Sequence, residues 1–464
     1  MREVYIIGVH TTKFGRHLDK SIKDLSSQTV EGCLKDAGID KKHLQALWFS
    51  NSGWGASGQT SIRGQVALRP VGIDTIPITN VENACAGAST AFHHAWLGVA
   101  SSLYDVTMAV GAEKLYSRNK MAVFAGFLGG IDIENLAKIA DNLSRYSLTE
   151  EELNQVEEFK KKYNTVKDKK EQKRKREPLL KTLHDRFVVA IELGEKLGYD
   201  VMWKLSRLSS GAHSPFMDIY GYAARQHMRK YGSTVEQLAI IASKNHYNST
   251  LNPNAQYCFE VPVEMVLRDR IVSWPLTRAM CAPIGDGAAS AILCSGEVVK
   301  RLGLKDRAVR IRASVLGSGT ERPFDLDTPE IGERLSKKAY EASGLGPEDI
   351  DLAEVHDATA YGELRQVENL GFCSKGEGGI LAERGETMLN GSIPVNTSGG
   401  LLSRGHPIGA SGLAQIHELT VQLRGMAGKR QVAKHRLAIA ENGGGALGVE
   451  EAAMCIHILE APSK

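Results

Sequence analysis

The sequence lacks any close pair of cysteines. Its seven cysteines are odd in number, lie scattered along 464 residues and include no C-x-x-C pair, which argues against a metal or redox site built from paired cysteines. Most of them are expected to be small buried residues. The fourteen histidines form no H-x-x-x-H pattern, so no metal is expected in this chain.

Long apolar runs and a strong charge of one sign are also absent. No stretch of about 18 apolar residues occurs, as a membrane-spanning helix would need, and the first residues, MREVYIIG, lack the pattern of a signal peptide. Lysine and arginine number 57 against 54 acidic residues, for a net charge of +3, which gives no overall basic field for nucleic acid. We therefore expect a cytoplasmic protein that binds neither membrane nor nucleic acid.

What the sequence does contain is an internal repeat. Residues 33–51, CLKDAGIDKKHLQALWFSN, are similar to residues 339–357, AYEASGLGPEDIDLAEVHD. Each segment predicts the end of a helix, a glycine cap at Gly38 or Gly344, a polar turn and a buried strand. Such self-similarity indicates a duplicated architecture.

A second pair of segments supports the duplication. Residues 83–98, NACAGASTAFHHAWLG, are similar to residues 404–419, RGHPIGASGLAQIHEL. Both segments lead into helices, and apolar strands that end in small residues follow them at 106–113 and 436–445. The chain is thus predicted to be two related α/β halves, with a shared site where the halves meet.

An insertion interrupts the first half. The N-terminal half is predicted at residues 1–114 plus 256–300, and the C-terminal half at residues 301–464. Residues 115–255 show helical periodicity and few β-branched runs, which predicts an inserted loop domain. Within it, residues 157–177 are highly charged with almost no apolar periodicity, so they form either a solvated face or a docking surface for phosphates or a partner.

Cys85 lies in a turn of small residues, ENACAGAS (82–89), that opens a helix. Unpaired backbone N–H groups and the helix dipole at such a place are expected to lower the pKa of a thiol. This environment suits a nucleophile. A lone cysteine is also a common core residue, so the interpretation depends on its neighbours.

Two histidines are candidates for the same site. His406, in SRGHPIGA (403–410), occupies a turn fixed by glycine and proline, where a base with a pKa near neutral can take the proton of the thiol. His356, in EVHDATAY (354–361), ends an apolar strand, where α/β proteins place ligand-binding groups, and can hold an acyl oxygen. A histidine in a turn is often only a capping residue, but the repeat relation of His406 to Cys85 favours a shared site.

A glycine triplet, Gly443-Gly444-Gly445, ends another apolar strand after Glu441-Asn442. Glycines let backbone N–H groups approach a developing oxyanion without steric obstruction. The triplet by itself is equally consistent with an ordinary turn.

Five motifs, in this order along the chain, together resemble the thiolases, and most closely the sterol-carrier-protein-type thiolases and their bacterial relatives. They are the cysteine turn, NPNAQ (252–256) with PLTRAMCAPIGDGAASAIL (275–293), EVHDATAYGEL (354–364), NTSGGLLSRGHPIGASG (396–412) and NGGGALG (442–448). The resemblance covers nearly the whole chain. It implies a five-layer αβαβα thiolase fold from two duplicated halves, with the inserted loop domain over the site for coenzyme A, which is a substrate.

The resemblance also implies a ping-pong reaction that cleaves a 3-ketoacyl-CoA or forms one in reverse. Cys85 would attack the 3-keto carbon, His406 would activate the thiol, and His356 would bind the thioester oxygen. The backbone N–H groups of Cys85 and Gly444 would form a second oxyanion hole. The substrate and coenzyme A site would be lined by five residues: His213, Ser214, Gly443, Gly445 and Tyr361.

One feature of the family is missing. Thiolases carry a second cysteine that protonates the departing carbon, but Ala358 occupies its place in the His-Asp-Cys motif, and Glu441 stands two residues before the glycine triplet. A carboxyl group near a buried thioester can have a raised pKa and shuttle that proton. We therefore predict Glu441 as the acid/base; its alternative role is to orient a loop, and Tyr361 is the next candidate.

Loss of the second cysteine leaves other functions open. It also occurs in thiolase-like retro-aldolases that act on 3-hydroxyacyl-CoA, and in proteins that work with a small zinc-containing OB-fold (DUF35) partner, to which any zinc would belong. Retention of Cys85 favours thiolase chemistry, because retro-aldol cleavage needs no acyl-enzyme. A non-catalytic scaffold or lipid carrier would be expected to have lost the histidines and glycines as well.

Within the partner-dependent group, the sequence is similar to the thiolase subunits that convert benzoylsuccinyl-CoA to benzoyl-CoA and succinyl-CoA in aromatic compound degradation. Phe124, Phe127 and Tyr361 can supply a pocket that tolerates an aromatic group, although aromatic residues are more often part of the core. The resemblance also implies a homodimer.

Overall fold

The computed structural model describes residues 2–116, 129–131, 148–165, 214–323 and 325–463. Their strands form one large mixed sheet and one small sheet. The large sheet takes five strands from the N-terminal half: β1 (Val4–Thr11), β2 (Ala46–Ser50), β3 (Ile78–Val81), β4 (Val106–Lys114) and β7 (Asp286–Ser295). It takes four from the C-terminal half: β8 (Val309–Ser318), β9 (Leu352–Glu354), β10 (Leu437–Gly444) and β11 (Ala453–Glu460). The small sheet pairs β5 (Ile271–Ser273) with β6 (Leu276–Thr277).

The two parts of the large sheet repeat one topology, which confirms the duplicated architecture. The strand order is β3-β2-β4-β7-β1-β8-β11-β10-β9. Each half contains one parallel pair, β2 with β4 and β9 with β10. Starting from these pairs, the order β2-β4-β7-β1 in the first half corresponds to β9-β10-β11-β8 in the second. An isolated parallel bridge between Ala353 and Val395 stands where β3 pairs with β2 in the other half. A short antiparallel pairing of β1 with β8 joins the halves.

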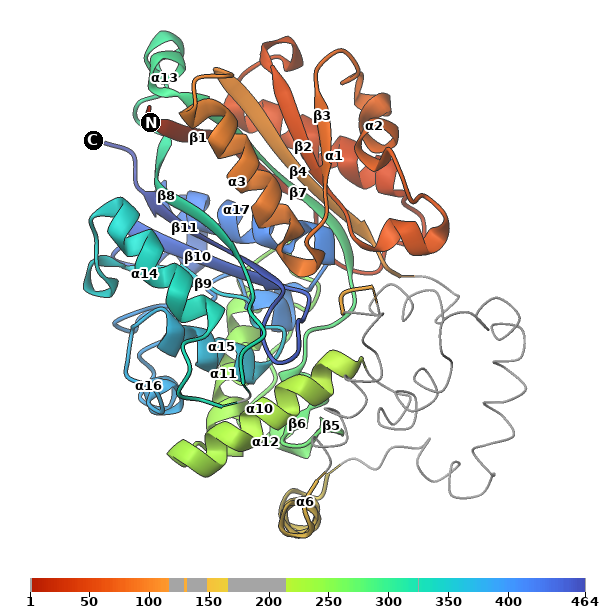
Figure 1. Cartoon of the computed structure of the whole chain (residues 1–464), viewed down its shortest axis with the longest axis vertical. Helices are drawn as coiled ribbons and strands as arrows, with labels where there is room; N and C mark the ends of the chain where they lie inside the picture. The colour runs from red at the N-terminus through yellow and green to blue at the C-terminus, as the bar shows by residue number, and fades with distance from the viewer. Residues whose placement is uncertain (1, 117–128, 132–147, 166–213, 324, 464) are drawn as a thin grey trace.

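Helices complete five layers around these strands, as the thiolase-like fold predicts. Helices α3 (Gly87–Ala100) and α17 (Ser411–Leu423) pack against each other between the two half-sheets, within one apolar core. Helix α1 (Ile22–Ala37) covers the outer face of the first half-sheet, and α14 (Ile331–Ser343) covers that of the second. Figure 1 shows the N-terminal half above the C-terminal half.

Local sequence explains where the repeated helices begin and end. Ser21 and Asp24 form a capping box at the start of α1, which satisfies two otherwise free N–H groups. Gly38 and Gly344 end α1 and α14 with a left-handed φ of 68° each, and both glycines donate their N–H to carbonyls of the last turn. Both glycine caps predicted from the repeat are therefore confirmed.

A separate group of helices lies below the C-terminal half in Figure 1 and shares its own apolar core. Four of its helices come from or follow the predicted insertion: α6 (Glu150–Tyr163), α10 (Pro215–Tyr231), α11 (Val235–Thr250) and α12 (Val263–Arg268). Helix α15 (Ala360–Asn369) of the C-terminal half packs against them. The short helix α16 (Gly378–Glu383) also packs against α11 and α15, and two other short helices lie elsewhere: α2 (Arg63–Leu68) and α13 (Gly296–Leu302). The boundaries of the three predicted regions stay a prediction.

The charged segment 157–177, predicted as a solvated helix or loop, begins as a helix that is docked on its neighbours. Residues 157–163 belong to α6, where Val156 and Phe159 are buried and the Phe159 ring lies 5.0 Å from that of Trp274. The prediction of almost no apolar periodicity is therefore wrong for this part, because one apolar stripe docks the helix. Residues 166–177 lie outside the described residues.

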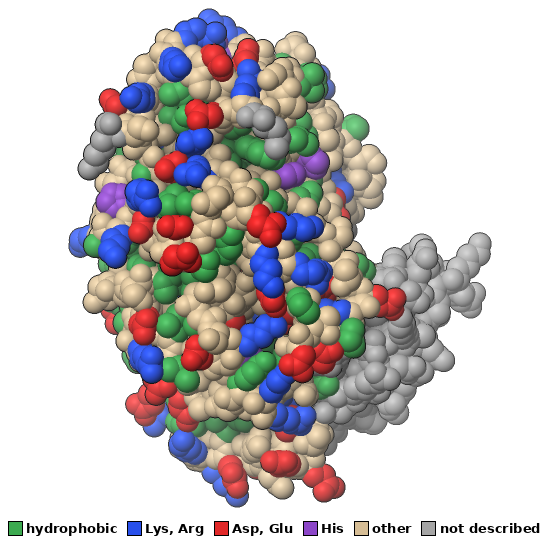
Figure 2. Space-filling model, turned by 60° about the vertical axis from the view of Figure 1, so that its left-hand side comes forward, with side chains coloured by type: hydrophobic (Ala, Val, Ile, Leu, Met, Phe, Trp, Pro, Cys, Tyr) green, Lys and Arg blue, Asp and Glu red, His purple; other side chains and the backbone are tan. Residues whose placement is uncertain are grey.

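No helix within the described ranges has both the length and the apolar character needed to cross a membrane. Positive and negative side chains are interspersed over the face shown in Figure 2, in line with the small net charge. The cellular compartment stays a prediction.

Candidate active site

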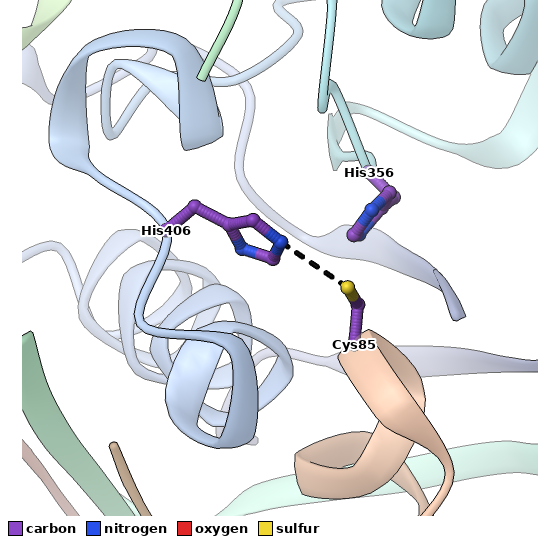
Figure 3. A group of neighbouring side chains, drawn as sticks. All are labelled: Cys85, His356 and His406. Carbon is purple, nitrogen blue, oxygen red and sulfur yellow. Dashed lines mark hydrogen bonds between the residues drawn. The ribbon is translucent and has the colours of Figure 1, made fainter. Parts of the chain in front are cut away.

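Turns from both halves bring Cys85, His356 and His406 together (Figure 3). Cys85 lies in a 3₁₀ turn, Ala84–Ala86, that leads into α3; His356 follows β9; and His406 follows the π-helical turn Gly400–Arg404. The sulfur of Cys85 lies 3.2 Å from Nε2 of His406, and the ring centroids of the two histidines are 5.3 Å apart. The three side chains thus meet between the halves, where the repeat predicts a shared site.

The hydrogen bonds of His406 determine which of its nitrogens carries a proton. Its Nδ1 lies 2.7 Å from Oγ of Ser411, and the Ser411 hydroxyl donates its proton to the carbonyl oxygen of Pro407 at 3.0 Å. Because a hydroxyl has only one proton, Ser411 accepts from the ring, so Nδ1 carries the proton. The lone pair of Nε2 faces the Cys85 thiol and can take its proton.

His356 has the opposite arrangement. Its Nδ1 accepts a hydrogen bond from the side-chain amide of Asn442 at 2.9 Å, which leaves the ring proton on Nε2. Burial, with a smaller contribution from Arg404, lowers the pKa of His356 to about 3. The ring is therefore neutral and can donate a hydrogen bond to a substrate oxygen.

The structure corrects two predictions about pKa. The pKa of the Cys85 thiol is raised to about 12. The main cause is the low water content around the sulfur, although the residue as a whole is partly exposed, and the carboxylates of Glu113 and Glu82 add to it. These effects outweigh the nearby backbone N–H groups, which lower the pKa. The pKa of His406 is not near neutral but well below its usual value, because of burial and then the nearby His356 and Arg404. The resting pair is thus a neutral thiol and a neutral imidazole, and the thiolate forms only as His406 takes the proton.

The glycine triplet packs directly against the cysteine turn. A Cβ at Gly444 would lie 2.3 Å from the backbone nitrogen of Ala86 and 2.8 Å from that of Cys85, so a larger residue would displace the turn. Gly445 has a φ of +67°, and its backbone N–H makes a small contribution that lowers the pKa of the Cys85 thiol. The oxyanion hole predicted at the N–H groups of Cys85 and Gly444 stays a prediction.

Glu441 lies on β10, fully buried, behind the loop that carries His356. Burial, with a further contribution from Glu451, raises the pKa of Glu441 to about 8. Its Oε1 has no hydrogen-bond partner among the described residues. The raised pKa agrees with the prediction, because a carboxyl group that is protonated at neutral pH can deliver a proton.

Two other thiols of the described residues, from neighbouring segments, contact threonines. The sulfur of Cys281 lies 3.4 Å from the carbonyl oxygen of Thr277, and the sulfur of Cys455 lies 3.7 Å from the hydroxyl of Thr90. Neither contact directs a thiol to the Cys85–His406 pair. Glu441 remains the candidate for the missing acid.

The remaining predicted residues lie further from this geometry. Tyr361 is only 2% exposed and packs in the core of the insertion helices, with its ring 5.7 Å from that of His227. Ser214 caps α10, where its Oγ accepts the N–H of Phe216 at 3.4 Å. The roles of Tyr361, Ser214 and Gly443 in substrate binding stay predictions. Three other predicted residues lie outside the described residues: His213, Phe124 and Phe127.

Sequence reasoning missed the residues that orient the two histidines. Ser411 lies five positions after His406 in the same motif, and Asn442 lies beside Glu441. Both are polar residues within motifs that contain the predicted site residues, and this is the feature of the sequence that could have indicated their role. Residue type and spacing do not reveal which ring nitrogen each side chain meets, so their roles needed the structure.

Glu113, at the end of β4, was also missed. Its buried carboxylate accepts the backbone N–H groups of Ser52 at 3.0 Å and of Gly409 at 3.1 Å. One carboxylate thus ties a loop of the N-terminal half to the turn that follows His406. This link holds the two halves in the register that brings the histidine to Cys85.

A thiol and two imidazoles are also potential ligands for a soft metal ion. The sulfur of Cys85 and one nitrogen each of His356 and His406 lie within 4.8 Å of one another, a set that suits zinc. Their positions are too far apart along the sequence for a spacing rule to detect. The orientation of the His406 lone pair towards the thiol equally suits acyl transfer.

The chain matches two family models, "Thiolase, N-terminal domain" over residues 4–156 and "Thiolase C-terminal domain-like" over residues 326–459. It is 33% identical to the acetyl-CoA acetyltransferase of Methanothermobacter thermautotrophicus, over 97% of this chain and 98% of the relative. It is 33% identical to the benzoylsuccinyl-CoA thiolase subunit BbsB of Thauera aromatica, over 93% and 91%. Human sterol carrier protein 2 is 31% identical over 95% of this chain and 70% of the relative.

Solved structures share the fold. The Ltp2-ChsH2(DUF35) aldolase has a TM-score of 0.68 at 20% identity, covering 100% of this chain and 98% of that chain. Human mitochondrial 3-ketoacyl-CoA thiolase has a TM-score of 0.61 at 15% identity, covering 100% and 99%. At these identities the likeness concerns the fold alone. The family models and the relatives show more: this chain belongs to the thiolase family and is an acyltransferase of the thiolase type.

Proposed function

We propose that this protein cleaves a 3-ketoacyl-CoA with coenzyme A, or condenses two thioesters in reverse, through an acyl group on Cys85. The observation that carries the proposal is the Nε2 lone pair of His406, 3.2 Å from the Cys85 sulfur and held in that tautomer by Ser411. This is the arrangement of a nucleophile with its general base.

The first half of the reaction breaks the carbon–carbon bond. Cys85 gives its proton to His406, and the sulfur bonds to the 3-keto carbon. The bond between carbons 2 and 3 then breaks, and its electron pair stays on carbon 2 as an enolate whose oxygen accepts from Nε2–H of His356. Glu441, protonated because its pKa is about 8, gives carbon 2 its proton.

The second half releases the acyl group and restores the enzyme. The thiol of coenzyme A gives its proton to the Glu441 carboxylate and attacks the acyl carbon. The acyl–Cys85 bond breaks, and the Cys85 thiolate recovers its proton from the His406 imidazolium. We assign the stabilisation of the tetrahedral oxyanion to the N–H groups of Cys85 and of the glycine turn, at Gly444 or Gly445; the support is the close packing of Gly444 against the backbone of Cys85.

For the substrate, we propose benzoylsuccinyl-CoA, cleaved to benzoyl-CoA and succinyl-CoA. The support is the 33% identity to the subunit BbsB over nearly the whole of both chains. Because that relative is named as a subunit, we also propose a second protein, a small zinc-containing OB-fold partner. A homodimer is proposed from the family resemblance; β3, at the edge of the sheet and just before the cysteine turn, is a strand available for pairing.

The test is the intact mass of the purified protein after brief incubation with acetyl-CoA, benzoyl-CoA or succinyl-CoA, alongside Cys85→Ala. We expect an adduct of the acyl mass on the parent protein and none on Cys85→Ala. Such an adduct on this chain alone would show that acylation needs no partner. The absence of any adduct, with or without an OB-fold partner, would contradict the thiolase mechanism and favour a retro-aldolase or a non-catalytic scaffold.

A further inference from the structure

A buried arginine–glutamate pair joins the two loops that carry His356 and His406 (Figure 3). Glu354 is the last residue of β9, two positions before His356, and Arg404 ends the π-helical turn, two positions before His406. Nη1 of Arg404 donates to Oε2 of Glu354 at 3.2 Å, and the two side chains are 3% and 0% exposed. One contact therefore connects the chain at corresponding points before the two histidines.

The segment that leads to His406 surrounds the Glu354 carboxylate with hydrogen-bond donors. The backbone N–H of Ser398 donates to Oε1 at 3.0 Å, and the Ser398 hydroxyl donates to Oε2 at 2.6 Å. The same hydroxyl accepts from Nη1 of Arg404 at 3.1 Å. Ser398 thus bridges the pair, and the strand end before His356 is fixed to the segment before His406.

Other contacts orient each histidine without joining the two loops. The ring of His356 accepts from Asn442, whereas the ring of His406 donates to Ser411. Asp357, directly after His356, adds a second connection between the loops, because it accepts two backbone N–H groups of the π-helical turn, at 2.6 and 3.3 Å. The relative position of the two rings therefore depends on this connection and on the buried pair.

The buried pair is incompletely satisfied, which indicates a role other than stability. Nε and Nη2 of Arg404 have no hydrogen-bond partner within the described part of the chain. Arg424, a similarly buried arginine at the C-terminal end of α17, donates from all three of its nitrogens, to two backbone carbonyls and to the carboxylate of Asp36. Burial raises the pKa of Glu354, although the charge of Arg404 acts against this rise. Buried charges with unpaired donors reduce stability, so this pair is retained at a cost.

The proposed cleavage needs both histidines at once. The sulfur of Cys85, beside His406, bonds to carbon 3, while His356 holds the oxygen on carbon 1 of the same substrate. Only carbon 2 separates these two positions, so the separation of the histidines has to match the substrate, and a misplacement of about 1 Å can slow a reaction about 10²-fold. Acyl transfer from an acyl-CoA to Cys85 uses His406 but not His356 in the proposed mechanism, and does not depend on that separation.

We propose that Glu354 and Arg404 are positioning residues, whose contact sets the separation between His356 and His406 that carbon–carbon cleavage requires. Each acts through the histidine two positions after it. The inference rests on the proposed acyl-enzyme function and assigns a role in it to two residues outside the reacting group.

The test measures two rate constants in each variant. One is the single-turnover cleavage of benzoylsuccinyl-CoA, or of acetoacetyl-CoA as a simpler 3-ketoacyl-CoA, by coenzyme A. The other is acylation of Cys85 by acetyl-CoA or benzoyl-CoA, followed by intact mass. In acylation the sulfur bonds to the acyl carbon, the bond from that carbon to the sulfur of coenzyme A breaks, and the thiol proton passes through His406 to the leaving thiolate. Both constants describe folded, reactive molecules, so unfolded protein does not change their ratio.

Three variants weaken the contact in different ways. Glu354→Gln places an amide against the guanidinium, and Arg404→Gln removes the cation; each is expected to slow cleavage about 10²-fold while acylation stays within about threefold. The double variant should be no slower than the slower single variant, because both lose the same contact. Ser398→Ala removes the bridging hydroxyl but leaves both charges, and should lower the ratio of cleavage to acylation about tenfold. This milder change keeps the test available where an unpaired buried charge prevents folding.

The control is Arg424→Gln, which breaks a buried arginine–carboxylate pair at the opposite end of α17 from Ser411. It should lower the melting temperature and leave the ratio of the two rate constants unchanged. An unchanged ratio in the three variants, or an equal change in Arg424→Gln, would overturn the positioning role. Effects of Glu354→Gln and Arg404→Gln that multiply in the double variant would show that the residues do not act as a pair. No adduct on the parent protein from any thioester would instead overturn the acyl-enzyme function itself.

Discussion

The carboxyl group of Glu441 accepts the backbone N–H of His356 through Oε2, at 2.8 Å, while its Oε1 has no partner among the described residues. One oxygen therefore supports the loop that presents His356, and the other stays available. These two contacts correspond to the two roles that the sequence allows for Glu441, an orienting group and an acid. Experiments on this residue have to separate them.

Replacing Glu441 with glutamine should separate the two roles. The amide keeps an oxygen for the N–H of His356 but has no proton to deliver at carbon 2. We expect carbon–carbon cleavage to slow by about 10²-fold or more. Acyl transfer from an acyl-CoA to Cys85 should slow much less, because the leaving thiolate of coenzyme A, unlike the carbanion, needs little help from the Glu441 acid. Single-turnover kinetics of both steps provide the measurement.

The matched control is Glu82→Gln, which removes another carboxylate beside the cysteine turn, one exposed to solvent. It should leave both steps near the parent rate. If Glu441→Gln cleaves its substrate as fast as Glu82→Gln does, Glu441 is not the acid. If both steps slow equally, the residue only orients the loop.

The raised pKa of Glu441 also predicts how stability depends on pH. The group moves from 4.5 in an unfolded chain to about 8 in the fold, so the folded state binds the proton more tightly. Its stabilising contribution is full below about pH 4.5 and is lost as pH rises through about 8. Thermal melts from pH 5 to 9 should therefore show the parent protein losing stability relative to Glu441→Gln, which has no such proton. A constant difference across this range would show that the carboxyl is already charged.

Much of the architecture could be predicted because it rests on local patterns. Gly38 and Gly344 were predicted as caps since a left-handed residue after a helix favours glycine, and the repeat located Cys85 and His406 in corresponding turns. Both predictions depend only on short segments. The same holds for Glu441, whose place on a buried strand was enough to indicate a raised pKa.

What failed depended on contacts between distant segments. The pKa of Cys85 was predicted to fall because α3 begins there, but burial and Glu113, which comes from another strand, raise it. The tautomer of His406 depends on Ser411 donating to Pro407, a geometry that spacing does not encode. Phe159 docks a segment whose composition suggests only solvent exposure, because its partner Trp274 lies far along the chain.

Zinc should inhibit the protein by occupying the nucleophile. The ligand atoms of Cys85, His356 and His406 lie within 4.8 Å of one another, and a thiolate with two imidazoles binds zinc well. We expect added zinc to protect Cys85 from iodoacetamide and to bind more tightly as pH rises, because binding releases the thiol proton. A chelator should restore alkylation. Equal zinc affinity in Cys85→Ala, measured by calorimetry, would place the metal elsewhere.

Ser411→Ala should weaken the base without removing it. The variant takes away the acceptor that holds the proton on Nδ1 of His406, so the ring no longer has its lone pair fixed towards Cys85. The loss of one such hydrogen bond is about 1.4 kcal/mol, or roughly tenfold in the rate of acyl transfer, with little change in KM. The control, Ser89→Ala, removes a buried hydroxyl on the adjacent α3 that has no hydrogen-bond partner among the described residues. Because both variants lose a buried oxygen, only a role in fixing the tautomer predicts a slower rate in Ser411→Ala alone; equal rates would mean that Ser411 merely supports the turn.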